Sequence, residues 1–111
     1  MEKIKKYQKA ILNVLNAYQR TSTTAVETLL LVDTEHHHYQ VVEAGWQDAD
    51  HYHYGILFHI HIKPTGKVVI LENNTEDDLA EFLIDNGVSK SDIVINFIPE
   101  RVRQFTGYAV A

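Results

Sequence analysis

Residues 51–62 carry the pattern that most restricts how this chain can fold. Apolar side chains occupy the even positions from Tyr52 to Ile62, while histidine dominates the odd positions. Because successive side chains of a strand point to opposite faces, this period of two predicts a strand that buries its even positions. The tight turn at residues 64–66 predicts an antiparallel hairpin with a further strand over residues 67–71.

The first half of the chain predicts one helix and two strands. Apolar residues recur at three- and four-residue steps over residues 2–19, which is typical of an amphipathic helix. A polar, β-branched break follows at residues 21–24. Residues 25–33 and 38–46 are rich in strand-forming side chains and are separated by a polar turn, so we expect two strands there.

The second half predicts a shorter helix and a final strand. Thr75 is a good N-cap with acidic residues after it, and Gly87 is placed to end the helix. The apolar run over residues 93–97 predicts a short strand, and Pro99 permits a last helical turn through Gln104. The result is an α+β fold: an N-terminal helix, an antiparallel four-stranded meander, a second helix, a short C-terminal strand and a helical turn.

Length and composition limit the class of protein. The 111 residues suit a single domain over residues 1–111, and 45% apolar residues are enough for a hydrophobic core. With no cysteine, the chain offers no disulfide, thiolate metal site or cysteine nucleophile. The longest apolar runs, such as residues 29–32, are far shorter than the ~20 residues of a membrane span. We therefore expect a cytoplasmic protein without a membrane segment.

The net charge of −5 is unevenly distributed. Residues 1–20 contain five basic residues and one acid, which leaves the rest of the chain at −9. Because phosphate contacts dominate nucleic-acid affinity, this balance argues against direct nucleic-acid binding, for which only the first helix or the Arg101/Arg103 segment would be available. A protein partner is the better expectation, including a basic one attracted by the acidic surface.

Seven histidines make a metal site the first chemical hypothesis to weigh. His59 and His61 lie two apart on one strand face, roughly 7 Å apart at their backbones, and such a pair can bind one metal ion. An acid such as Asp33, Asp48 or Asp50 would have to complete the site. The simpler interpretation is a half-exposed sheet face that tolerates histidine, so we predict no metal. A metal-dependent hydrolase using His59 and His61 is the alternative.

We predict no catalytic residue and no cofactor, because the sequence has neither a G-x-S-x-G elbow nor a glycine-rich phosphate loop. Candidates for binding a partner are Arg101 and Arg103, whose guanidinium groups suit carboxylates and phosphates, and Tyr108 in the apolar C-terminal tail. Trp46 and two tyrosines of the following strand could form an interface patch. Core packing is the expected role for Trp46.

Several short motifs occur in a fixed order along the chain. They are Tyr7 to Ile11 in the first helix, Gly45-Trp46, His53-Tyr54-Gly55, His59-Ile60-His61-Ile62, Thr75-Glu76 with Ala80, and the end from Pro99 to Ala111. In this order the chain resembles, over nearly its whole length, the XisI-like family of fdxN-element excision controlling factors. Two departures are Ile98, where the family tends to have histidine, and Val69, where an aromatic residue is usual. If that histidine carries activity in relatives, this chain lacks it.

The resemblance implies a cytoplasmic, mostly cyanobacterial accessory protein that helps to control site-specific excision of a DNA element. It implies a non-enzymatic regulator, because the excision chemistry belongs to a separate recombinase. Family members often occur beside an XisH-like protein, which itself resembles a nuclease fold. An XisH-like protein is therefore the expected partner, and the resemblance transfers no catalytic residue.

The sequence also predicts self-association. A four-stranded meander leaves two sheet edges that invite pairing. The histidine-bearing face has few charges, and the tail over residues 105–111 is unusually apolar. We expect a homo-oligomer, most simply a two-fold dimer, that buries this tail or the histidine face. If histidines line the contact, protonation below their usual pKa of ~6.5 should weaken it.

Overall fold

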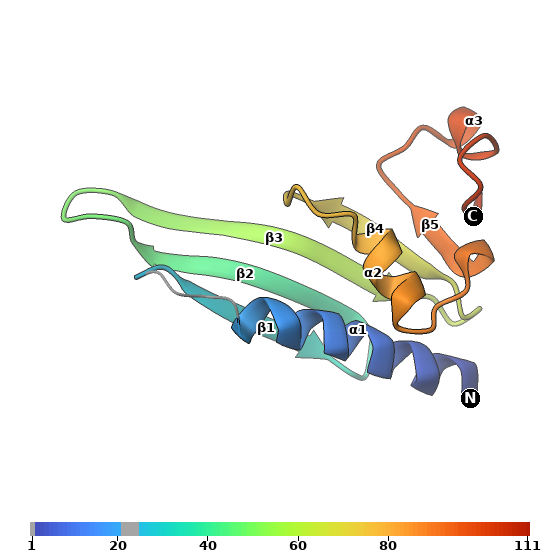
Figure 1. The fold of residues 1–111 in the computed structure, drawn as a ribbon, viewed down its shortest axis with the longest axis horizontal. Helices are drawn as coiled ribbons and strands as arrows, with labels where there is room; N and C mark the ends of the chain where they lie inside the picture. The colour runs from blue at the N-terminus through green and yellow to red at the C-terminus, as the bar shows by residue number, and fades with distance from the viewer. Residues whose placement is uncertain (1, 21–24) are drawn as a thin grey trace.

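The computed structural model describes residues 2–20 and 25–111, so the break predicted at residues 21–24 lies outside the described residues. The elements, shown in Figure 1, are α1 (Glu2–Arg20), β1 (Glu27–Asp33), β2 (His38–Trp46), β3 (Tyr52–Ile62), β4 (Val68–Asn73), α2 (Leu79–Asp85), the 3-10 helix η1 (Lys90–Asp92), β5 (Ile93–Ile95) and α3 (Glu100–Arg103). The predicted α+β fold and its order of elements are confirmed. Within the described residues, no helix is both long and apolar enough to cross a membrane.

The five strands form one sheet whose strand order follows the sequence. The pairs β1–β2, β2–β3 and β3–β4 are antiparallel, which confirms the predicted meander. The sequence predicted the C-terminal strand but not its place in the sheet. In the structure β5 pairs parallel with β4, so the sheet has five strands and not four. A parallel pair needs a crossover connection, and α2 lies in it.

Both longer helices pack on the same face of the sheet, in front of it in Figure 1. Ile11 and Leu15 of α1 and Leu83 of α2 are fully buried against Phe58 and Ile60 of β3. Burial of apolar surface at ~25 cal/mol per Å² makes this layer the main source of stability. The opposite face of the sheet receives neither of these helices.

A β-bulge in β3 changes the predicted alternation. Val41 of β2 pairs with Phe58, but the next residue, Val42, pairs with Ile56, so Leu57 is an extra residue in β3. Paired residues of neighbouring strands share a face of the sheet. Even-numbered residues of β3 after the bulge therefore face the helices, whereas even-numbered residues before it face the opposite side of the sheet.

The prediction for β3 is consequently right on one side of the bulge and wrong on the other. Phe58, Ile60 and Ile62 are buried under the helices, as the alternation indicated. Tyr52 and Tyr54 were predicted to share that buried face, but they are 57% and 68% exposed and lie on the opposite one. Beyond the bulge, the even positions have moved to the helix-free side.

Thr75 was predicted as the N-cap of α2, but the N-cap in the structure is Asp78. The Asp78 carboxylate accepts the backbone N–H of Glu81 at 3.2 Å. Thr75 belongs to the preceding turn, where its hydroxyl donates to the side chain of Asn73 at 2.6 Å. Gly87 ends the helix as predicted, with a left-handed φ of 105° that favours glycine.

Asp92, in η1, forms a buried ionic contact with Lys3 of α1 and with Lys67, which comes just before β4. Its carboxylate accepts the Tyr7 hydroxyl at 2.5 Å and lies 3.0 Å from Lys3 Nζ and 3.7 Å from Lys67 Nζ. The Tyr7 oxygen also accepts the backbone N–H of Ser89 at 3.3 Å. Burial acts to raise the pKa of Asp92, but the hydrogen bonds from Tyr7 and Lys3 and the lysine charges outweigh it, so this pKa lies below its usual value.

Replacing this carboxylate should destabilise the fold. We expect Asp92→Ala to lower the free energy of unfolding by about 2 kcal/mol, because the buried Tyr7 hydroxyl loses its charged acceptor. Asp85→Ala removes an exposed carboxylate from α2 and serves as the control, with a change within about 0.5 kcal/mol. Urea unfolding at neutral pH measures both, and equal losses in the two variants would contradict the role given to Asp92.

Candidate functional site

The helix-free side of the sheet, here called the outer face, carries an ordered grid of side chains. The strand register places them in rows across β1, β2 and β3, namely Glu27, Ala44 and Tyr54; Leu29, Val42 and Ile56; Leu31, Gln40 and His59; and Asp33, His38 and His61. Trp46 and Tyr52 form one more row at the end of the β2–β3 hairpin. The outer face therefore has a histidine end, an apolar middle and an aromatic end.

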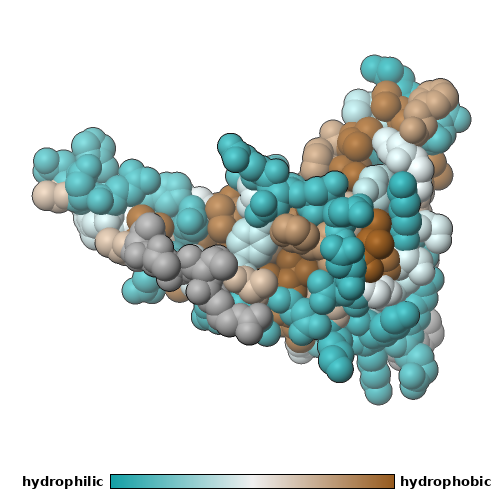
Figure 2. Space-filling view, in the orientation of Figure 1, coloured by the Kyte–Doolittle hydropathy of each residue, from teal (hydrophilic) through white to brown (hydrophobic). Residues whose placement is uncertain are grey.

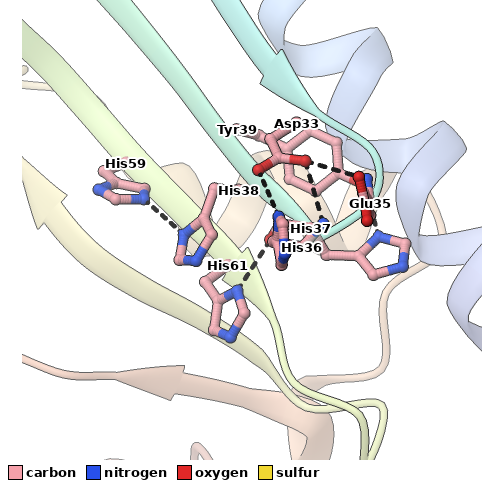
Figure 3. Close-up of polar contacts among 8 residues, drawn as sticks. All are labelled: Asp33, Glu35, His36, His37, His38, Tyr39, His59 and His61. Atoms are coloured by element: carbon pink, nitrogen blue, oxygen red, sulfur yellow. Dashed lines mark hydrogen bonds and ion pairs between the residues drawn. The ribbon is translucent and has the colours of Figure 1, made fainter.

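Three histidines meet at one end of the outer face (Figure 3). The rings of His38 and His61 stack with centroids 4.2 Å apart and an interplanar angle of 12°. His38 Nδ1 lies 3.0 Å from His59 Nε2, and His61 Nδ1 lies 2.8 Å from the carbonyl oxygen of His37. The strand pairing of β2 with β3 brings these rings together from distant parts of the sequence.

The partners of these rings indicate where the protons lie. His61 must donate from Nδ1, because the His37 carbonyl can only accept. The side-chain amide nitrogen of Gln40 lies 3.4 Å from His59 Nδ1, and an amide NH₂ group can only donate. With the Gln40 amide oriented this way, His59 carries its proton on Nε2 and donates it to His38 Nδ1, and both rings are neutral.

Two of the three histidines resist protonation. Burial lowers the pKa of His59, and the neighbouring His38 and His61 lower it further. Burial also lowers the pKa of His38, followed by the effect of His61. Both effects disfavour the charged imidazole, since a buried charge loses solvation and like charges repel.

The pair predicted as a metal candidate shares a face, but no acid completes it. His59 and His61 contact His38 and a backbone carbonyl, as described above. Asp33 instead pairs with His36 at 3.0 Å, and Asp48 with His51 at 2.7 Å. Over residues 2–20 and 25–111, no three histidine, aspartate or glutamate side chains are arranged to hold a metal ion. The rings of His38, His59 and His61 are instead engaged in hydrogen bonds with one another and with a backbone carbonyl.

The other end of the outer face is aromatic and open. Trp46, expected to pack in the core, is 56% exposed, and its ring meets that of Tyr52 edge to face at 5.2 Å. Tyr54 lies on the same face and is more exposed still. This hairpin end extends beyond both long helices in Figure 1. The interface patch that the sequence offered as an alternative therefore fits the structure better than core packing.

Arg103, a predicted partner-binding residue, organises the C-terminal segment from within. Its guanidinium donates to the backbone carbonyls of Ile98 at 2.9 Å, Val110 at 3.0 Å and Asn96 at 3.1 Å. These bonds join both ends of the segment around α3. The geometry assigns Arg103 the role of holding the tail in place.

Tyr108 is also engaged within the chain. It packs half-buried against the core, with Lys90 Nζ 5.0 Å from the centre of its ring. The next residue, Ala109, donates its backbone N–H to the carbonyl of Ile93 at 2.8 Å. The tail is thus docked onto β5, and chain ends that dock in this way stay ordered.

The same segment exposes side chains suited to a partner. Arg101 is exposed, as are Phe97 at 54%, Val110 at 48% and Phe105 at 80%. Figure 2 shows hydrophobic atoms on the part of the surface where Figure 1 places α3 and the C-terminus. Sequence reasoning named Arg101 and covered Phe105 within the apolar tail over residues 105–111, but it missed Phe97.

Sequence reasoning did not predict the apolar middle of the outer face. Leu29 and Leu31 of β1 lie beside Val42 and Gln40 of β2 and keep 37% and 47% of their surface exposed. The sequence held one signal, since Leu57 interrupts the histidine positions of β3. An apolar residue out of phase in an alternating strand is where a bulge would be expected.

Comparison with known proteins agrees with the motifs. The family model described as XisI protein matches residues 1–110. The crystal structure of an XisI-like protein from Anabaena variabilis ATCC 29413 is 35% identical and superposes with a TM-score of 0.86, covering 97% of this chain and 99% of the other. A search of curated proteins gave no match. The chain belongs to the XisI family.

A second solved structure extends the likeness of the fold. It is described as the fdxN element excision controlling factor XisI from Anabaena variabilis ATCC 29413. It is 23% identical, has a TM-score of 0.80, and covers 98% of this chain and 99% of the other. At this identity the comparison concerns the fold.

The histidine cluster should make stability depend on pH on the acidic side of neutrality. Because His38 and His59 have lowered pKa values when folded, the unfolded chain binds more protons below its histidine pKa of ~6.5. Stability should therefore fall between about pH 7 and pH 5, and His59→Gln should make this fall shallower. Urea unfolding across this range measures it.

Gln40→Ala is the control for this experiment. It removes the neighbour of His59 but keeps both titrating imidazoles, so the dependence on pH should persist. If His59→Gln shows the same slope as the unmodified chain, the cluster does not contribute as described.

Proposed function

We propose that this protein is a non-enzymatic accessory regulator that acts in the cytoplasm to help control site-specific excision of a DNA element. The observation that carries this proposal is membership of the XisI family over residues 1–110. A relative of the same fold is described as an excision controlling factor, which names a regulator and not a recombinase. We assign the chain no catalytic residue and no cofactor.

The regulator acts by binding a protein partner, for which an XisH-like protein is our candidate. The C-terminal segment supports a binding surface, because it exposes Arg101, Phe97 and Phe105 within a few residues of each other in sequence. Aromatic and arginine side chains are enriched among residues that dominate binding energy. The carbonyl bonds of Arg103 hold this segment in shape, which reduces the entropy lost on binding.

Charge supports a protein partner over nucleic acid. The chain carries −5 overall, and a basic surface is what phosphate binding requires. Lys3 of the basic first helix pairs with Asp92, and Arg103 uses its guanidinium on backbone carbonyls. In both the first helix and the C-terminal segment, a basic side chain is therefore already engaged in a contact within the fold.

Mixing the purified chain with an XisH-like protein from the same genome tests this function. We expect one earlier peak in size-exclusion chromatography at micromolar concentration. Phe105→Asp should weaken the complex at least about tenfold, since it places a charge where an aromatic anchor is proposed. Val32→Asp changes an exposed apolar residue of β1 and should bind normally. Two unshifted peaks for the unmodified pair would contradict the proposal.

Arg101 and Arg103 should separate binding from folding in the same assay. Arg101→Ala should reduce the affinity for the partner and leave the melting temperature unchanged, because its side chain is exposed. Arg103→Ala should lower the melting temperature, because three backbone carbonyls lose their donor. The opposite pattern would show that Arg103 is the contact and Arg101 the support.

A further inference from the structure

The outer face is an unusually apolar surface for a sheet that meets solvent. Antiparallel sheets with one solvated face normally alternate apolar and polar residues, so that the exposed face is polar. Here the exposed face carries Leu29, Leu31, Trp46, Tyr52 and Tyr54, each more than a third exposed. Contiguous apolar patches of this kind mark interaction sites.

Formal charge on the rows across β1, β2 and β3 is confined to the two ends of β1. Glu27 and Asp33 occupy these ends, and Asp33 already pairs with His36 at 3.0 Å. Across β1, β2 and β3 the rows between them hold only neutral side chains. On β4, the exposed Glu72 pairs with His59 and adds one carboxylate to the outer face. Two copies of a chain with a net charge of −5 would repel over most of their surface, but the rows across β1, β2 and β3 add charge to this face only at the two ends of β1.

The outer face is just large enough for a small specific interface. β1, β2, β3 and β4 have 7, 9, 11 and 6 residues, so at ~3.3 Å per residue and ~4.8 Å per strand the four strands present roughly 520 Å². Two such faces in contact bury about 1,000 Å², which is the lower limit of the area expected of a specific interface. Stacked sheets are also a standard way to cover an apolar sheet face, with about 10 Å between them.

We propose that the outer face binds the outer face of a second copy of this chain, so that two sheets stack in a two-fold dimer. A two-fold contact places the same patch on both sides, and a neutral apolar patch is complementary to itself. Trp46, Tyr52 and Tyr54 supply the aromatic anchors that dominate such contacts. A basic partner would be drawn to the acidic remainder of the chain and would gain nothing from this neutral face. The residues proposed to bind an XisH-like protein, Phe97, Arg101 and Phe105, belong to the C-terminal segment and are not in the rows of the outer face.

Neighbouring residues of β1 provide a matched pair of variants. Leu31 lies on the outer face and is 47% exposed, whereas Val32 lies on the helix side and is 42% exposed. Leu31→Lys places an uncompensated charge in the proposed contact, and Val32→Lys places the same charge on the other side of the same strand. Circular dichroism and the melting temperature confirm that both remain folded.

Sedimentation velocity at tens of micromolar and neutral pH tests the dimer. We expect the unmodified chain and Val32→Lys to sediment as dimers, and Leu31→Lys to raise the dissociation constant at least about tenfold. Tyr54→Lys, at the aromatic end, should do the same. A monomeric unmodified chain would overturn the proposal. This holds also if the outer face turns out to bind an XisH-like protein in place of a second copy.

Two further outcomes would also overturn it. A dimer that survives both Leu31→Lys and Tyr54→Lys does not use the outer face. A dimer lost equally in Leu31→Lys and Val32→Lys uses the edge of β1 and not the face of the sheet. Phe105→Asp should remain dimeric, so failure of the XisH-like partner to bind and failure of the dimer are separate results.

Discussion

One extra residue in β3 decides which side chains face the helices and which face outward. Asn74 supports this bulge, because its backbone N–H donates to the carbonyl of Leu57 at 2.7 Å and its side-chain amide donates to the carbonyl of Ile56 at 3.0 Å. The carbonyls freed by the irregular pairing are thereby satisfied. On one side of the bulge β3 builds the core, and on the other it carries Tyr52 and Tyr54 to the outer face. Tyr52 and Tyr54 reach the outer face because of this change of phase.

The two proposed surfaces would work together in one assembly. A dimer joined by its outer faces leaves the C-terminal segment of each copy exposed, so it would present two sites for a partner. Two linked sites raise the apparent affinity for a partner that can engage both at once. The geometry inside each copy suits this arrangement, since Arg103 and the docked Tyr108 hold the segment in a defined shape.

Two family positions have a physical explanation in this fold. A Cβ atom at Gly45 would lie 2.9 Å from the carbonyl oxygen of Ala25, so only glycine permits the chain before β1 to pass this close to β2. At Ile98 the sequence departs from the histidine that the family resemblance leads one to expect, but its backbone carbonyl accepts the Arg103 guanidinium, a bond that any residue there can supply. The departure at Ile98 therefore leaves the framework of the C-terminal segment intact.

The sequence by itself determined the elements, the meander and the family, because periodicity and capping are local and the motifs are read in order. It could not place the bulge at Leu57, since a bulge depends on the register of a partner strand and on Asn74 beyond the next hairpin. It could not find the burial of Asp92, whose Tyr7 partner lies 85 residues away in the chain. Trp46 is a large aromatic residue of the kind usually found in a core, and only the tertiary structure decided that it lies on the face of the sheet opposite both long helices.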